Sequence, residues 1–348
     1  MPSRQTFLTL ARFAIGIGLL AYLAKSGLID FRSLPRLFVA WRISLAAVAL
    51  LLLDVVLMAF RLCWLFRPLG LHIPLRRSLQ LTLVSFFLST FLPGAAGSDI
   101  AKLFYASREN SGRRAEIVTI VLLDRAIGLF SLLILPLLFA PMFLPLVGAV
   151  PALRILLITL GLLGSGLLGG FLMVLFSPPL MNWLVRVVVR RPLWNSFARR
   201  VVGTIATYRK NPGTLVAALI ASLAANLSLV AVTALAVLAL NPTSMEAKMC
   251  LVIPIGHVAN SLPLTPGGLG VGETAFNALF KLTGLRGGAE ALLGWRVWTV
   301  LVGFLGLVAY LRGLGRIVFE EGHVLKEGLE VSGGPVHLGA GLMKHGSS

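Results

Sequence analysis

Charged side chains interrupt several long apolar stretches of this 348-residue sequence. A charge at the centre of a lipid bilayer costs at least about 2.5 kcal/mol, so residues of this kind are expected to be paired and to serve a function. We interpret them as candidate contacts for a charged substrate group. The alternative interpretation is a set of structural ion pairs that hold helices together. The residues are Asp54, Arg61, Asp99, Lys102, Asp124, Arg125, Glu273 and Arg296.

Two similar turns accompany these charges, one in segment 91–99 (FLPGAAGSD) and one in segment 264–273 (LTPGGLGVGE). Each has the pattern Pro-Gly-x-x-Gly and ends on a carboxylate. Proline ends the preceding helix, and glycine permits positive φ and close approach of other groups. Irregular backbone at membrane depth is tolerated only where protein or water satisfies it. We therefore expect a polar cavity lined by Pro93, Gly94, Gly97, Pro266, Gly267, Gly268 and Gly270.

The spacing after each turn is also similar. Arg125 and Arg296 each follow the proline of their turn by about 30 residues, near the start of the next apolar segment. The correspondence predicts two ion pairs, Asp99 with Arg125 and Glu273 with Arg296. A helix that starts after each turn is expected to offer free N–H groups and a positive dipole end to an anion such as phosphate.

These residues require a framework of membrane helices. Six apolar segments reach the length of about 20 residues that crosses a bilayer core. They run over 7–24, 43–66, 117–139, 155–177, 214–240 and 290–311. Two shorter apolar segments, 79–92 and 251–264, lead into the turns and are expected to be re-entrant hairpins. If both cross the bilayer instead, the count rises from six spans to eight.

The fold predicted from these segments is an all-α polytopic membrane protein with an inverted repeat. The transmembrane domain covers 1–316, with repeat halves at about 5–140 and 153–312, and 317–348 forms a flexible cytoplasmic tail. Lys and Arg are more frequent in the loops that lie on the same side of the membrane as the N-terminus. This asymmetry predicts that both termini are cytoplasmic. Interrupted helices in corresponding positions of two halves are typical of transporters. Chance similarity of two Gly/Pro turns is the alternative.

Composition supports the membrane assignment. Hydrophobic residues make up 57% of the sequence and charged residues only 13%, about half the charge of a typical soluble domain. The net charge of +18 suits anionic lipid headgroups, and no recognition motif accompanies it, so we predict no nucleic-acid partner. The two cysteines form no metal-ligand spacing, and no catalytic motif is present. We predict no metal and no cofactor.

The basic stretch 178–213 also contains Trp183, Trp194 and many apolar residues. It is interpreted as a cytoplasmic interfacial helix whose arginine side chains reach the headgroups, or else as a long basic loop.

The two turns, together with segment 123–128 (LDRAIG), resemble the flippase-like transmembrane domain of lysylphosphatidylglycerol synthases, over about residues 5–315. The resemblance implies translocation of a charged lipid, such as an aminoacylated phospholipid, across a bacterial inner membrane. Ala95, Ala96 and Ser98 depart from the more glycine-rich form of the first motif.

Two alternatives to translocation stay open. Bifunctional members carry an aminoacyl-transfer domain after the membrane part, and the short stretch that follows the last span here predicts that this activity is absent. Some relatives are linked to hopanoid or polyprenyl-linked lipid metabolism, which implies a lipid-synthesis enzyme as a partner. The alternatives are an accessory subunit of a lipid or hopanoid synthesis complex, and an intramembrane enzyme that uses Asp99 and Glu273.

Overall fold

The computed structural model describes most of the chain between residues 34 and 309. The described residues are 34–91, 99, 102–103, 106, 112–177, 195–241, 245–262, 264–265 and 268–309. Every regular element within these ranges is a helix, as the sequence predicts. The predicted span over 7–24 and the predicted tail over 317–348 lie outside them.

Five helices in the described part of the chain are long and apolar enough to cross a bilayer. They are α3 (Trp41–Phe66), α6 (Arg114–Phe139), α8 (Pro151–Phe176), α11 (Pro212–Leu240) and α14 (Gly288–Ala309). Each coincides within a few residues with one of the predicted segments. Short helical turns extend α3 and α6, namely η2 (Arg67–Leu69), η3 (Ala140–Phe143) and α7 (Leu144–Ala149).

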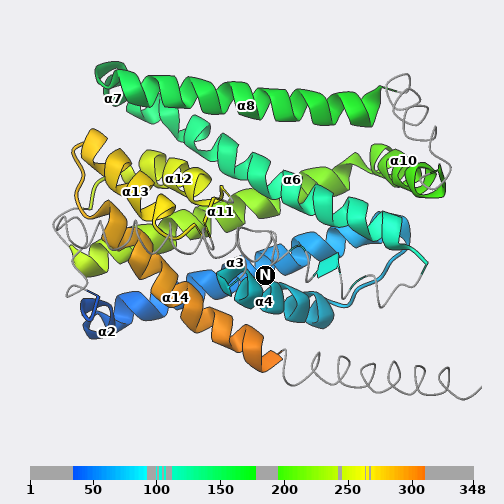
Figure 1. The fold of residues 1–348 in the computed structure, drawn as a ribbon, viewed down its shortest axis with the longest axis horizontal. Coiled ribbons are helices and arrows are strands. Elements are labelled where there is room, and N and C mark those ends of the chain that lie inside the picture. Colours follow the sequence, from blue (N-terminus) through cyan, green and yellow to red (C-terminus); the bar gives the residue numbers. More distant parts are fainter. Residues whose placement is uncertain are drawn as a thin grey trace, which may run out of the picture. The chain divides into compact units, whose positions relative to one another are not determined.

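The shorter apolar segments form shorter helices. Segment 79–92 lies in α4 (Leu75–Phe91), and segment 251–264 begins as α12 (Met249–Asn260) and is followed by α13 (Val271–Leu282). Twelve helical residues span only about 18 Å, less than the bilayer core of about 30 Å. Helices α12 and α13 pack against each other (Figure 1) and form a helical hairpin at the second segment expected to be re-entrant.

Two further helices flank the apolar ones. The short helix α2 (Arg36–Val39) precedes α3, and α10 (Asn195–Lys210) precedes α11. The second part of the basic stretch 178–213 is thus helical, whereas residues 178–194 lie outside the described part of the chain.

Helix α11 packs along α3 and also contacts α6, and α6 in turn packs against α8 and α12 (Figure 1). Helix α11 carries small buried residues, among them Ala218, Ala221, Ser222 and Ala225. Small side chains let membrane helices approach closely, so packing there does not depend on large apolar contacts. The close approach brings the polar residues of α11 within reach of charges on α3 and α6.

Helices α4 and α14 are in backbone contact at Gly306. A Cβ atom at this position would overlap the carbonyl oxygen of Leu83, so only glycine lets the two helices approach this closely. Thr82 and Ser85 of α4 and Trp295 and Thr299 of α14 line the same cavity.

Candidate functional site

The carboxylate of Asp124 on α6 is held by two bases. Arg61 Nε on α3 donates to its Oδ1 at 2.6 Å, and Lys102 Nζ donates to its Oδ2 at 2.8 Å. Arg61 Nη1 also donates to Ser222 Oγ of α11 at 2.8 Å. All four residues are buried. The cluster therefore ties α3, α6 and α11 together around charges that have no access to bulk water.

A second ion pair lies next to this cluster. Arg125 Nη1 contacts Asp99 Oδ2 at 2.6 Å, which confirms the pairing predicted from the repeated turn. Successive helical residues point in different directions, so Asp124 and Arg125 take different partners. The Arg125 and Asp99 side chains are 27% and 18% exposed, against 2% for the side chain of Asp124. The second pair is thus the more accessible of the two.

Both clusters line one cavity of about 300 Å³, which is within the range of small-molecule sites. Its charged wall consists of six of the residues singled out in the sequence, and their formal charges sum to zero when all are ionised. These are Asp54, Arg61, Asp99, Lys102, Asp124 and Arg125. The structure thus brings together the charges of the first predicted half.

Asp54 is buried on α3, about two helical turns before Arg61. None of the described residues forms a hydrogen bond or an ion pair with its carboxylate. It is therefore an acidic group of the cavity wall that is available to a ligand or to water.

Three more polar atoms of the cavity wall are buried without a partner among the described residues. They are Thr82 Oγ1 and Ser85 Oγ on α4 and Trp295 Nε1 on α14. A buried polar atom without a hydrogen bond costs about 1–3 kcal/mol. The arrangement is therefore typical of a site whose polar groups are completed by water or by a bound molecule.

The second half of the chain contains the other predicted pair. Arg296 Nε on α14 contacts Glu273 Oε1 on α13 at 2.6 Å, as the repeat predicts. Glu273 Oε2 accepts a hydrogen bond from the N–H of Gly270 at 2.7 Å, and Arg296 Nη2 donates to Asn260 Oδ1 at 2.8 Å. This cluster joins α12, α13 and α14.

The cluster around Glu273 differs from the expectation in two respects. Gly268, Gly270, Glu273 and Arg296 are not among the residues that line the cavity, and Glu273 is fully buried. Two N–H groups at the start of α13 are also engaged, since Glu273 takes that of Gly270 and the carbonyl of Gly268 takes that of Gly272. The side chain that follows the turn thus occupies the position expected for an external anion.

Gly268 shows why the second turn is rich in glycine. Its φ is 71°, and a Cβ atom there would overlap the side chain of Asn260. The turn therefore closes directly onto the end of α12. Of the remaining predicted turn residues, Pro93, Gly94, Gly97, Pro266 and Gly267 lie outside the described residues.

Trp295 connects the cavity wall with helix α12. Its ring is part of the cavity wall and packs edge-on against His257 of α12, at a centroid distance of 5.1 Å. His257 Nε2 is hydrogen-bonded to Thr233 Oγ1 of α11 at 2.8 Å. A continuous polar and aromatic contact path thus leads from the cavity to α12.

Sequence reasoning missed the uncharged polar residues of the cavity wall. The signal that could have found them is a polar residue within an otherwise apolar helix. These residues are Thr82, Ser85, Ser222, Asn226, Trp295 and Thr299. Among the described residues, no group of three or more His, Cys, Asp or Glu side chains is placed to hold a metal ion.

Comparison with protein families gives a match over most of the chain. Residues 9–312 match the family described as lysylphosphatidylglycerol synthase TM region. No curated protein and no solved structure matches the chain. The matched range contains the cavity, the ion pairs around Asp124, Asp99 and Glu273, and the five long apolar helices named above. The chain therefore belongs to the lysylphosphatidylglycerol synthase TM region family, as its motifs indicate, and it is a multi-pass membrane protein.

Proposed function

We propose that this protein moves a lipid with an anionic or aminoacylated headgroup between the leaflets of the bacterial inner membrane. The observation that carries the proposal is the cavity of about 300 Å³ among membrane-spanning helices, with three carboxylates and three bases in its wall. Charges at this depth are costly and mark substrate pathways. Family membership supports a role in lipid biology.

The two ion-pair clusters of the cavity suggest different roles. Arg61, Lys102 and Asp124 are buried and mutually satisfied, so opening them would leave charges uncompensated. The pair of Arg125 and Asp99 is partly accessible, and an incoming anion meets it first. In this proposal a headgroup phosphate replaces Asp99 as the partner of Arg125 through charge-assisted hydrogen bonds.

The proposed mechanism includes the inverted repeat and the cytoplasmic location of both termini. The two matched ion pairs support the repeat, because each joins a carboxylate after a Pro-Gly turn to an arginine 26 or 23 residues later, on a long apolar helix. In the proposal the halves 5–140 and 153–312 rock against each other, and the two turns control access from opposite sides.

The proposal assigns no catalytic activity and no cofactor to the protein. Asp99 and Glu273, the two carboxylates that an intramembrane enzyme would use, are each bound to an arginine. A reacting group would therefore have to displace the arginine from either carboxylate.

Reconstitution into liposomes tests the proposal directly. Purified protein is incorporated into vesicles that contain fluorescent phosphatidylglycerol or its lysylated derivative, and leaflet exchange is followed by quenching of the outer leaflet. We expect exchange above that of protein-free vesicles for at least one of the two lipids. We also expect Arg125→Gln to slow it about tenfold, as the loss of one charged hydrogen bond implies.

Arg154→Gln is the matched control, because it removes the same charge from an exposed position of α8 outside the cavity. Its exchange rate should equal that of the wild type. Absence of exchange for both lipids, or equal rates in the Arg125 variant and the wild type, contradicts the proposal.

A further inference from the structure

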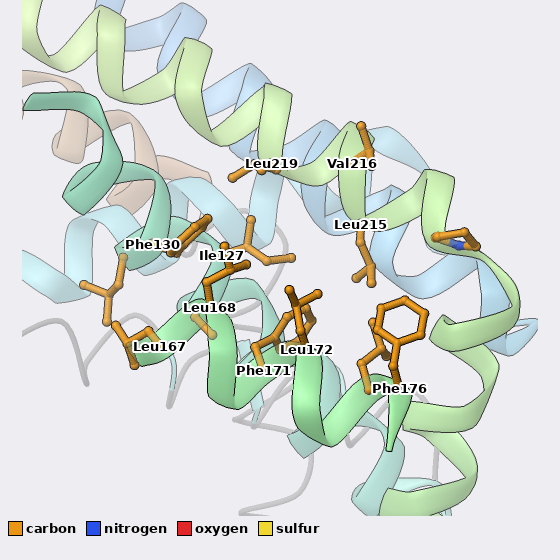
Figure 2. Close-up of a pocket in the computed structure, with 14 residues that line it drawn as sticks. Ile127, Phe130, Leu167, Leu168, Phe171, Leu172, Phe176, Leu215, Val216 and Leu219 are labelled. Atoms are coloured by element: carbon orange, nitrogen blue, oxygen red, sulfur yellow. The ribbon is translucent and has the colours of Figure 1, made fainter. Parts of the chain in front are cut away.

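A second cavity, of about 400 Å³, lies between α6, α8 and α11 (Figure 2). Its lining side chains are all apolar, and leucine and phenylalanine predominate among them. Figure 2 shows Leu215 of α11 pointing toward Leu172 and Phe176 of α8 across the opening. Ile127 and Phe130 of α6 form one end of this apolar groove.

The groove and the polar cavity share one turn of α6. Arg125 and Gly128 face the polar cavity, whereas Ile127 and Phe130 face the groove, and Leu129 lines both. A molecule with an anionic group near Arg125 and an apolar part in the groove would contact Leu129 with both parts. The two sites together match the two parts of an amphipathic ligand.

The position of the groove restricts what fills it. All three of its helices are membrane spans, so its opening faces hydrocarbon and not water. Leu172 and Phe176 are 41% and 50% exposed, whereas Ile127 and Leu175 are buried. The groove thus has an open apolar rim and a closed apolar floor, a shape that suits a flexible hydrocarbon chain that enters from the bilayer.

We infer that this groove binds one hydrocarbon chain of the lipid whose headgroup occupies the polar cavity. The inference rests on the proposed function and adds the class of ligand to it, an anionic lipid with a long acyl or isoprenoid chain. A soluble anion would fill the polar cavity alone. Because the hydrocarbon chain of the lipid has a separate binding site in the groove, the headgroup enters the polar cavity while the lipid tail remains in an apolar environment.

Photolabelling in lipid nanodiscs tests the inference. The probe is phosphatidylglycerol with a diazirine in one acyl chain, and labelled residues are mapped by mass spectrometry. We expect labelling to concentrate on groove residues such as Leu172, Leu215 and Leu219. We expect little on Leu162 and Leu163, which are exposed on α8 outside the groove.

Filling the groove should abolish this pattern. Leu172→Trp adds bulk inside the groove, and Leu162→Trp makes the same change on the same helix outside it. Exclusion of about two methylene groups lowers binding about tenfold, so groove labelling should fall by that factor in the first variant and remain unchanged in the second. Diacylglycerol with the same chain lacks the charged headgroup and should label the groove more weakly than phosphatidylglycerol.

Three outcomes overturn the inference: labelling spread evenly along α8, equal labelling by the two lipids, or a cross-link that shows another segment of this chain in the groove. The liposome assay gives a separate result for the proposed function. Groove labelling without leaflet exchange contradicts the proposed translocation, whereas the proposed binding of a hydrocarbon chain in the groove still holds. Leaflet exchange at the wild-type rate in Leu172→Trp, with evenly spread labelling, contradicts the groove and leaves translocation.

Discussion

Arg61 Nε on α3 lies 2.6 Å from Asp124 Oδ1 on α6, although 63 residues separate them in the sequence. Both side chains are almost fully buried, and Ser222 of α11 accepts a further hydrogen bond from Arg61. The pair therefore fixes the relative positions of three membrane helices at the cavity wall. Its contribution depends on both charges, because burial leaves no water to replace a lost partner.

Asp124→Asn is expected to destabilise the protein strongly. It leaves Arg61 and Lys102 without a compensating charge, and breaking a buried pair in this way costs about 3–5 kcal/mol. Thermal unfolding in detergent measures the loss. Glu246→Gln is the control, because its pair with Lys248 is exposed and worth at most about 1 kcal/mol. Equal unfolding temperatures for the two variants would show that the buried cluster is not structural.

The two pairs predicted from the turns should differ in their effect on stability. Glu273 is fully buried and also holds the N–H of Gly270, so Glu273→Gln should lower the free energy of unfolding by about 3 kcal/mol or more. Asp99 is partly exposed, and Asp99→Asn should cost about 1 kcal/mol or less while it changes the rate of lipid exchange. Thermal unfolding and liposome exchange on both variants check this. The reverse order of stability would contradict it.

Much of the fold could be predicted from the sequence, because long apolar segments of bilayer length have few structural alternatives. The pairing of Asp99 with Arg125 and of Glu273 with Arg296 was also predictable, since a similar spacing occurs twice. The pairing of Arg61 with Asp124 was not, because it depends on how α3 and α6 pack and no local spacing encodes it.

The uncharged part of the site was harder to predict. Serine and threonine are tolerated in apolar helices because their hydroxyl groups bond to the carbonyl four residues earlier, as Thr119 and Ser228 do here. In the sequence, Thr82 and Ser85 cannot be distinguished from such residues. They differ only in that they line the cavity, which the sequence does not reveal. Glu273 is not among the residues that line this cavity, and its side chain caps α13.

Gly306→Ala should separate α14 from α4. The added Cβ atom would overlap the backbone carbonyl of Leu83, and overpacking of this kind costs about 1–3 kcal/mol. Gly166→Ala on α8 is the control, because no atom lies within 4 Å of its added Cβ. There the better helix propensity of alanine should raise stability by up to about 1 kcal/mol. Thermal unfolding should therefore shift in opposite directions, and a shift in the same direction would contradict the close contact.

Thr82→Val and Thr233→Val form a matched test of the cavity wall. Both threonines are buried in helices, but Thr233 Oγ1 is bonded to His257, whereas Thr82 Oγ1 has no partner among the described residues. Thr233→Val leaves His257 Nε2 without this bond, so it should lower the free energy of unfolding by about 1–3 kcal/mol. Thr82→Val removes no bond to any of the described residues, so stability should stay the same or rise slightly.

Lipid exchange should respond in the opposite way. If Thr82 Oγ1 bonds to a headgroup or to the water around it, the valine variant loses about 1 kcal/mol of binding and exchange slows about fivefold. Thr233 does not line the cavity, so its variant should exchange lipid at the wild-type rate below its unfolding temperature. A Thr82 variant that is both destabilised and fully active would mean that the hydroxyl supports the fold and that the cavity wall is closed at α4.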